Sequence, residues 1–587
     1  MFVKLRRFLE ECNRSLTGKQ VQQVFLYMAF VLRFCQKYSI DLKEEDTLPG
    51  LLPRLFQKIL RYEIKESAFA FDSYMPWNIL QQDWTLHDSI NELFYELYKN
   101  EYATSEWLVN AVDEILADGV LTPKFVRMLI AKLAAQRSVS QITDLCSGTF
   151  LLGLETWNEM GKKDDVKCYG EEINSYLCAI SRLLLFLCDV EIFTIKEQDV
   201  IKYNPDKMTS QESKVIVADL PLVGNRTIPV PEKDRFLSEK KRTLYADWMI
   251  TYKILQQLNS GDRAFLLVTK GALVRENEYF LRKHFIDADC VDAVITLPNN
   301  IYPNYNLPMN LLIFEKERSA DRKGKVLFID LNQKTEADLS DNIIEKISRM
   351  FYEYKAEEQF AKIVNYEEIV SKDYIFNPLI YLSNEGVLDG QLSIRDIACV
   401  TRGIQDLSGN RDVNSKERYL LNVRDIQEGE IIYETAQIIR GGNPLWEEKF
   451  LIKEDDIIIT AKGATLKLAI VPPNPEPAYI SGNLMILRVN MDRYSPYVLY
   501  EYLLSEKGQL ALSLIQTGTT IRVLGTKKME QLKIPEYECE TVRMIGDGLK
   551  LATLQYRQAL QDANSKFKLK KEELLSCFNK GKGNEDV

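Results

Sequence analysis

The sequence predicts an α/β protein with a helical N-terminal domain, a doubly wound Rossmann-like sheet, and a β-rich region that ends in a long helix. Residues 1–120 show helical periodicity with hardly a β-branched run. From about residue 140, short apolar runs alternate with helical segments, which is typical of a parallel sheet. The expected domains are an N-terminal helical domain (1–120), the α/β domain (121–355), a linker (356–390), a β-rich domain (391–536), and a C-terminal helix and tail (537–587).

Composition narrows the class of protein. The chain has 587 residues, of which 46% are hydrophobic and 27% charged, and this length requires several domains. Its longest apolar runs, 25–34 and 183–193, are too short to span a membrane, so we expect a cytoplasmic protein without membrane contact. The ten cysteines form no CxxC pair and there are only two histidines, which argues against disulfides, a metal site and histidine-dependent catalysis.

The net charge of −10 limits how nucleic acid could be bound. A protein with this balance is not coated in basic surface, so any contact with DNA must come from a local cleft. The sign of the total charge does not exclude DNA as a partner.

Seven strand candidates predict the sheet of the α/β domain. Most of them alternate with helical segments, and ligands bind at the carboxyl ends of strands in such sheets. The candidates are 141–148, 165–172, 214–221, 263–270, 291–298, 310–317 and 325–331. A helix that begins after Thr122 and Pro123, with the threonine hydroxyl as its cap, is expected to enter this domain.

Four polar features follow predicted strands, where a nucleotide-type ligand would bind. The loop Asp144–Phe150 precedes a helix, so its backbone amides can meet a ligand. Glu172 can accept from both hydroxyls of a ribose, and Asp199 can accept from an adenine amino group. Asp219, in the stretch ADLPL, has two interpretations: a site carboxylate at a strand end, or an ordinary turn residue before proline.

This ordered set of motifs resembles the adenine-N6 DNA methyltransferases of the type I restriction-modification M-subunit family, over about residues 100–335. The segment 263–298 is especially similar to the family's strand, helix and VI-LP strand. The resemblance implies S-adenosylmethionine as cofactor and double-stranded DNA as partner. It assigns cofactor contacts to Thr122, Asp144, Ser147, Gly148, Glu172 and Asp199, and the catalytic motif to Asp219, Leu220, Pro221 and Leu222.

Two motifs depart from the family pattern. The family's cofactor loop usually carries three glycines, whereas this loop has only Gly148. The catalytic motif normally ends in an aromatic residue that stacks on the flipped base, and here Leu222 takes its place, a loss of roughly 1 to 3 kcal/mol in stacking. Two hypotheses stay open: an active methyltransferase, or a pseudo-methyltransferase that binds DNA or partner subunits. A nucleotide-dependent dehydrogenase is disfavoured because no GxGxxG follows the first strand.

The C-terminal third resembles one half of the specificity (S) subunits of the same systems. Residues 392–405, 456–471 and 514–535 are similar to successive segments of a target-recognition domain, so the resemblance implies an M subunit fused to a half S subunit. Basic residues on its predicted turns are candidates for DNA contact: Lys462, Lys467, Arg522, Lys527 and Lys528. Apolar residues at helical spacing predict pairing of two chains, or assembly with other restriction-modification subunits, through Val542, Ile545, Leu549, Ala552 and Tyr556. No helicase or nuclease motif is evident, so DNA cleavage would need another polypeptide.

Overall fold

The structure is a computed structural model in which the chain forms two compact units, Met1–Leu382 and Ser383–Val587. In the described part of the chain, no helix combines the length and apolar character needed to cross a membrane. The described residues are 17–40, 84–99, 109–111, 121–202, 213–220, 226–232, 234–298, 301–302, 309–332, 334, 339–357, 360–382, 392–405, 417–440, 448–463, 465–517 and 522–580.

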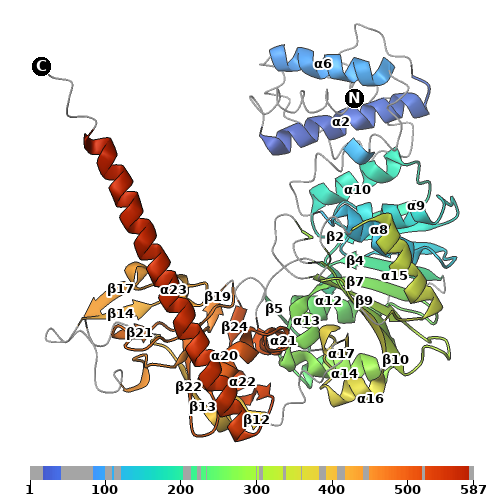
Figure 1. The fold of residues 1–587 in the computed structure, drawn as a ribbon. Helices are drawn as coiled ribbons and strands as arrows, with labels where there is room; N and C mark the ends of the chain where they lie inside the picture. Colours follow the sequence, from blue (N-terminus) through green and yellow to red (C-terminus); the bar gives the residue numbers. More distant parts are fainter. Residues whose placement is uncertain are drawn as a thin grey trace, which may run out of the picture. The chain divides into compact units, whose positions relative to one another are not determined.

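A nine-stranded sheet forms the centre of the first unit, in the order β11-β10-β8-β9-β7-β4-β1-β2-β3 (Figure 1). This sheet confirms the predicted α/β class. Its strands are β1 (Gln141–Asp144), β2 (Lys167–Glu172), β3 (Phe193–Glu197), β4 (Lys214–Asp219), β7 (Arg263–Thr269), β8 (Val291–Thr296), β9 (Met309–Glu315), β10 (Lys325–Asp330) and β11 (Ala361–Asn365).

The sheet differs from the prediction in strand number and direction. Strands β9 and β11 run antiparallel to their neighbours. Only residues 297–308 separate β9 from β8, a length at the lower limit for the crossover that parallel pairing would need. Strand β3 was not predicted because it is an edge strand in which only Ile195 is fully buried, so it lacks an apolar run.

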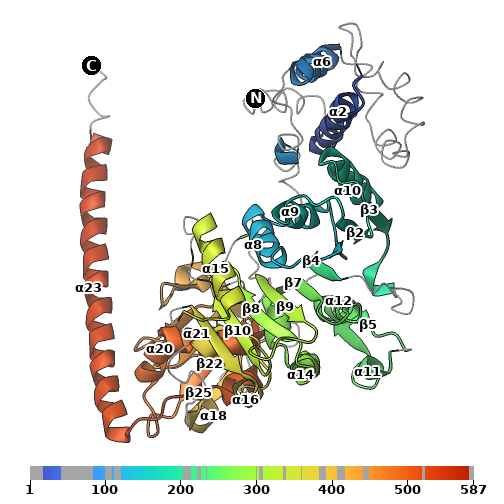
Figure 2. The same ribbon diagram turned by 90° about the vertical axis from the view of Figure 1, so that its right-hand side faces the viewer.

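Helices cover both faces of the sheet. Helices α8, α9 and α15 pack together on one face, and α12 and α14 lie on the other (Figure 2). The helices of this unit are α2 (Gly18–Lys37), α6 (Trp84–Lys99), α8 (Lys124–Ala134), α9 (Leu151–Glu159), α10 (Ser175–Leu187), η1 (Val200–Lys202), α11 (Arg235–Ser238), α12 (Ala246–Leu255), α13 (Lys270–Val274), η3 (Glu276–Glu278), α14 (Tyr279–Asp287), α15 (Asp341–Glu353), α16 (Tyr366–Ser371) and α17 (Leu379–Leu382).

Helix α2 of the N-terminal region packs on α10 of the α/β domain. The ring centroids of Phe30 and Phe186 are 5.5 Å apart, and Arg33 and Lys37 both pair with Asp189. The described residues of the N-terminal region therefore share an apolar core with the sheet domain.

Part of the predicted linker belongs to the sheet. Residues 361–365 form β11, which pairs with β10, and α16 follows it directly. The assignment of 356–390 to a linker is therefore wrong for this stretch. The short strand and the six-residue helix leave too weak a periodic pattern in the sequence to be recognised.

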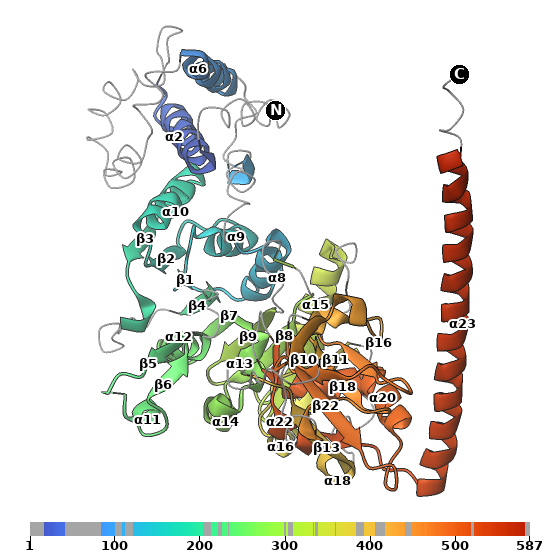
Figure 3. The same cartoon turned by 90° about the vertical axis from the view of Figure 1, so that its left-hand side faces the viewer.

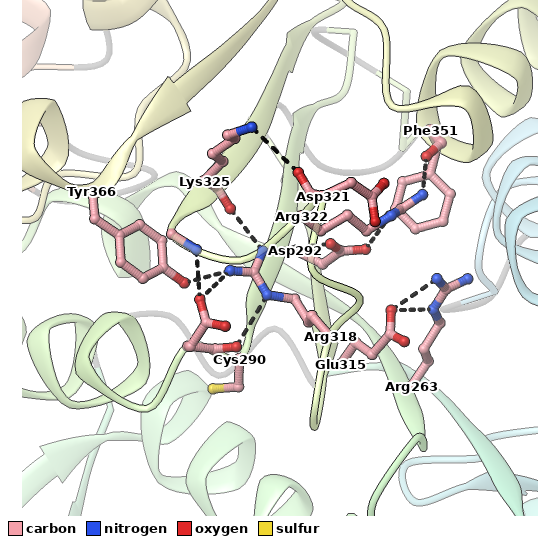
Figure 4. A network of polar contacts seen from close by, with 12 residues as sticks. Arg263, Cys290, Asp292, Glu315, Arg318, Asp321, Arg322, Lys325, Phe351 and Tyr366 are labelled. Carbon is pink, nitrogen blue, oxygen red and sulfur yellow. Dashed lines mark hydrogen bonds and ion pairs between the residues drawn. The ribbon is translucent and has the colours of Figure 1, made fainter.

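A network of buried ion pairs lies at the amino-terminal ends of the parallel strands β8 and β10, away from the carboxyl ends where ligands bind (Figure 4). Arg322 binds Asp292 at 2.7 Å and the carbonyl of Phe351 at 2.5 Å, while Arg318 pairs with Asp289 and the Tyr366 hydroxyl. Removing one partner of such a buried pair typically costs about 3 to 5 kcal/mol, because a charge is left buried without compensation. The network fixes β8, β10 and α15 relative to one another.

The second unit is β-rich, as predicted. Its larger sheets have the orders β13-β22-β18-β20, β17-β14-β21 and β19-β24-β23. The strands are β12 (Leu392–Ser393), β13 (Ala398–Arg402), β14 (Glu417–Leu421), β15 (Ile426–Gln427), β16 (Glu430–Ile431), β17 (Gln437–Arg440), β18 (Ile457–Thr460), β19 (Lys462–Gly463), β20 (Leu468–Ile470), β21 (Ala478–Ile480), β22 (Leu484–Val489), β23 (Gln516–Thr517), β24 (Arg522–Leu524) and β25 (Lys533–Ile534). The helices are α18 (Ile394–Ile397), η5 (Val423–Asp425), η6 (Tyr433–Thr435), α20 (Pro496–Leu504), α21 (Glu506–Ile515), α22 (Thr526–Gln531) and α23 (Cys539–Lys580).

Helix α23 is 42 residues long and packs on its own unit over its first turns (Figure 1). Val542 is buried against α20, Lys550 pairs with Asp455 at 2.7 Å, and Arg557 pairs with Glu430 at 2.8 Å. These contacts account for Val542 and Leu549 of the predicted pairing surface. The other three residues of that surface, Ile545, Ala552 and Tyr556, are exposed.

Candidate cofactor site

The candidate site lies where the strand order of the first sheet reverses. From β1 the chain proceeds to β2 and β3 on one side, and then crosses to β4 on the other. In open α/β sheets, ligands bind in the crevice beyond the carboxyl ends of the strands at this point. A cavity of about 70 Å³ opens here, lined by Leu121, Thr122, Asp144, Cys146, Ser147, Gly148, Thr149, Leu151, Leu152, Asp219, Leu220 and Tyr302.

Asp219 ends β4 and is held by hydroxyl groups from two distant segments. Its Oδ2 accepts from the Thr122 hydroxyl at 2.7 Å and from the Tyr302 hydroxyl at 2.8 Å. Burial raises the pKa of Asp219 to about 6, although both hydrogen bonds favour the carboxylate. No described contact takes up Oδ1, so this oxygen remains available as an acceptor.

The cavity is acidic. Burial raises the pKa of Asp144 well above its ordinary value, and the charges of Asp219 and Glu172 raise it further. The pKa of the Cys146 thiol is also raised, first by burial and then by the nearby carboxylates, which argues against a nucleophilic thiolate. Among the described residues, no lysine or arginine lines the cavity. The site therefore favours a ligand that carries positive charge.

Glu172 ties the loop after β1 to the end of β2. Its two carboxylate oxygens accept from the backbone amides of Gly148 and Asn174, each at 2.9 Å. The Ser181 hydroxyl donates to the Gly148 carbonyl at 2.9 Å. Both backbone groups of Gly148 are therefore bonded, and the loop has a defined conformation.

Phe150 occupies a backbone conformation that glycine usually adopts. Its φ is 63°, in the left-handed region, which is rare for a bulky residue. The buried ring fits against two glycines: a Cβ at Gly153 would lie 2.5 Å from the ring, and a Cβ at Gly170 would lie 2.9 Å from it. Packing of the ring thus stabilises Phe150 in a left-handed backbone conformation that glycine would adopt without strain.

The Ser147 hydroxyl is a buried polar group that faces the cavity. Ser147 lines the cavity, is 6% exposed, and its Oγ has no hydrogen-bond partner within the described structure. A buried hydroxyl without a partner is costly, and a bound ligand or an ordered water would satisfy it.

The structure brings most of the predicted cofactor and catalytic residues together. Thr122, Asp144, Ser147, Gly148, Asp219 and Leu220 line one cavity, and Glu172 contacts its loop. Asp199 lies apart from the cavity lining, where it accepts from the backbone amide of Ile201 after β3. Pro221 and Leu222 lie outside the described residues.

One prediction about Thr122 is wrong, and two residues were missed. Pro123 is the N-cap of α8, which has no side-chain cap, because the Thr122 hydroxyl donates to Asp219 instead. Tyr302 was missed because it lies 83 residues from Asp219 and in no motif. Ile173 was missed because an isolated apolar residue is uninformative in sequence; it is 67% exposed beside Glu172, where a ligand could cover it.

The predicted DNA-contacting residues of the second unit differ in surroundings. Lys462 and Lys527 are exposed. Lys462 lies on β19, and this strand pairs with β24, which contains Arg522. The Lys467 ammonium instead donates to the carbonyls of Val423 and Ile426, at 3.1 and 2.7 Å. Lys467 therefore has a structural role here, contrary to the prediction that it reaches DNA.

An acid-lined cavity therefore lies at the reversal point of a Rossmann-like sheet, the place where ligands bind in folds of this class. Residues 105–389 match the family model described as N-6 DNA Methylase. The chain is 26% identical over 323 residues to the type I restriction enzyme MjaVIII methylase subunit of Methanocaldococcus jannaschii, covering 50% of this chain and 54% of that protein. It is 27% identical over 291 residues to the type I restriction enzyme MpnII methylase subunit of Mycoplasma pneumoniae, covering 45% and 53%.

The chain spans about half the length of these curated relatives. Among solved structures, it is similar to the methyltransferase subunit of a type I restriction-modification system from Streptococcus thermophilus. That comparison has 18% identity and a TM-score of 0.49, and covers 64% of this chain and 98% of the other.

The left-handed backbone at Phe150 predicts an unusual order of stability. Phe150→Ala should lower the free energy of unfolding by about 3 kcal/mol, because the buried ring is removed. Phe150→Gly should be about 1 kcal/mol more stable than Phe150→Ala, because glycine adopts this φ without strain. Urea unfolding followed by circular dichroism measures both.

Phe265 provides the matched control, because it is equally buried but lies in the regular strand β7. There, the alanine variant should be more stable than the glycine variant. The same order at Phe150 as at Phe265 would contradict the role given to the left-handed turn.

Proposed function

We propose that the first unit is an S-adenosylmethionine-dependent methyltransferase that acts on the N6 amino group of adenine in DNA. The observation that carries the proposal is the acidic cavity at the sheet reversal, with Asp219 at its edge, inside the region that matches the N-6 DNA Methylase family. A flipped base could place its amino group at Oδ1 of Asp219, which would accept a hydrogen bond as positive charge develops on the nitrogen.

The residues of the cavity fit the proposed cofactor. S-adenosylmethionine carries a positively charged sulfonium, which supplies the methyl group, and an ammonium group. Asp144 and Asp219 would offer negative charge without competing basic side chains, and the unpaired Ser147 hydroxyl would offer a further polar contact. Glu172, at the end of β2, is the candidate for the ribose hydroxyls.

The same charges disfavour the dehydrogenase alternative. A dinucleotide brings an anionic diphosphate to the loop after β1, where it needs backbone amide donors that are free to bind it. Here the Gly148 amide is bonded to Glu172, and Asp144 lies at the start of the loop. A cationic cofactor suits this site better.

The pseudo-methyltransferase is the second candidate. Leu222 in place of an aromatic residue, and the small volume of the cavity, favour it. The ordered loop favours activity, because Phe150, Gly153 and Gly170 together keep the turn that the missing glycines would have allowed. The two candidates differ in whether methyl groups are transferred.

Calorimetry with S-adenosylmethionine tests the cofactor. Glu172→Ala should weaken binding by about 1 to 3 kcal/mol, because it removes charged hydrogen bonds both to the ligand and to the Gly148 loop. Glu191→Ala is the control: it removes the same charge from an exposed residue just before β3, at the opposite edge of the sheet. Equal affinity in both variants would exclude Glu172 from the site.

The pH dependence of methyl transfer tests Asp219. Its carboxylate is the acceptor, and with a pKa of about 6 its ionised fraction rises with pH, so the rate at pH 5 should be about tenfold below that at pH 7. Tyr302→Phe removes a hydrogen bond that favours the carboxylate, which should shift this acid limb to higher pH.

Transfer of labelled methyl groups to a random duplex library measures the rate. Tyr279→Phe is the control, because it removes the hydroxyl of a half-exposed tyrosine that does not line the cavity. It should leave the acid limb of the pH–rate profile unchanged. Activity that persists in Asp219→Ala would show that the ADLPL stretch is only a turn. Cofactor binding without any transfer would establish the pseudo-methyltransferase.

We further propose that the second unit is a target-recognition domain of the half S-subunit kind, fused to the methyltransferase. The exposed Lys462 and Lys527, together with Arg522 on the strand beside Lys462, are its candidate DNA contacts. Such a chain would read one half of a two-part DNA site, and two chains would be needed for both halves.

Helix α23 supports pairing of two chains. Along its length it carries exposed large apolar residues, among them Ile545, Tyr556, Leu560, Phe567 and Leu574. Successive positions are 11, 4, 7 and 7 residues apart, spacings that keep them along one side of a helix and suit a second helix. Light scattering should give twice the mass of one chain, and a single-chain mass both free and on DNA would contradict the pairing.

A further inference from the structure

The segment between β4 and α12 concentrates positive charge in an acidic chain. From Arg226 to Arg242 the sequence has six basic and three acidic residues, against a net charge of −10 for the whole protein. We call this segment, with its two strands β5 (Thr227–Pro229) and β6 (Thr243–Tyr245), the basic hairpin. Its strands and the short helix α11 lie together beside α12 (Figure 3).

The charges of the basic hairpin are available for a partner. Arg226, Arg235, Lys240 and Arg242 are exposed, and within the described residues none of them pairs with a carboxylate. The acidic Asp234 of this segment is already occupied, since it pairs with Lys253 at 3.6 Å. Exposed basic residues are commonly only solvated, so their position and support must decide their role.

The base of the hairpin is firmly anchored. The backbone amide of Tyr245 donates to Glu278 at 3.1 Å, and the Arg275 guanidinium lies 4.1 Å from the centre of the Tyr245 ring. Arg275 also pairs with Asp247 and Glu278. This partly buried ion cluster holds the hairpin in one orientation, as a contact surface requires.

The ion cluster that anchors the hairpin lies at the carboxyl end of β7, next to the strand that carries Asp219. Asp247 accepts from the hydroxyl of Thr269, the last residue of β7, at 3.0 Å. Strand β7 pairs with β4, where Leu267 lies opposite Asp219. The hairpin base is therefore one strand away from the proposed acceptor of the target amino group.

We propose that the basic hairpin binds the phosphate backbone of duplex DNA beside the target base. The inference rests on the proposed function and adds to it a surface of the first unit that holds the duplex. Phosphates are bound by arginine and lysine side chains on positioned elements, and such contacts fix the register of the protein on DNA. Extrusion of a base from the stack needs its flanking phosphates to be held, which a rigid basic ribbon at this edge would do.

The test is the salt dependence of DNA binding, which needs no catalysis. The double variant Lys240→Gln/Arg242→Gln should lower the slope of log affinity against log salt by about 1.8, or about 0.9 for each phosphate that the protein no longer neutralises. Between 1 M and 0.1 M salt, this change of slope corresponds to a loss of roughly sixtyfold in affinity relative to the wild type. Fluorescence anisotropy of a labelled random duplex gives both values.

The control double variant Lys162→Gln/Lys163→Gln removes the same charge from exposed residues between α9 and β2, at the opposite edge of the sheet. Its slope should equal that of the wild type, as should the slope of the charge-conserving Lys240→Arg/Arg242→Lys. An unchanged slope in the hairpin variant, or an equal loss in the control, would overturn the inference while leaving the proposed function intact. A wild type that does not bind duplex DNA at low salt would overturn both.

Discussion

The position of every site residue in the first unit depends on one topological constraint, the reversal of strand order between β1 and β4. The strands β1 and β4 are adjacent and parallel, but the chain leaves β1 toward one side of the sheet and leaves β4 toward the other. The connecting segments therefore leave the side chains at the ends of these two strands uncovered. Asp144 and Asp219 meet there, and Thr122 and Tyr302 come from distant parts of the sequence to bond one oxygen of Asp219. The buried ion pairs of Arg318 and Arg322 lie elsewhere in the same sheet, where they hold β8 and β10 together.

The buried carboxyl groups at the reversal of strand order determine which charge a bound ligand should carry. Burial raises the pKa values of two carboxyl groups that have no basic neighbour in the cavity lining, and groups perturbed in this way are concentrated at functional sites. A ligand with positive charge would lower that cost by favouring the ionised forms. The binding of such a ligand and the ionisation of the carboxyl groups are therefore coupled, and each promotes the other.

Sequence patterns predicted the α/β class and most strands, because buried parallel strands leave continuous apolar runs. They also marked Asp144, Glu172 and Asp219, since polar residues that directly follow such runs stand out. They could not reveal Tyr302, whose partner is 83 residues away, nor the internal bonding of Lys467. Strands β3 and β11 escaped because edge strands are short and partly exposed, and so lack a distinctive period.

The packing of Phe150 against Gly153 and Gly170 also restricts how this loop can evolve. Glycine at position 150 would leave a buried space empty, whereas a larger residue at 153 or 170 would collide with the Phe150 ring. Each single step lowers stability, although the three changes made together could preserve it. The three positions are expected to vary as a group among descendants of this protein, and a loop of this kind, once acquired, is difficult to lose by single substitutions.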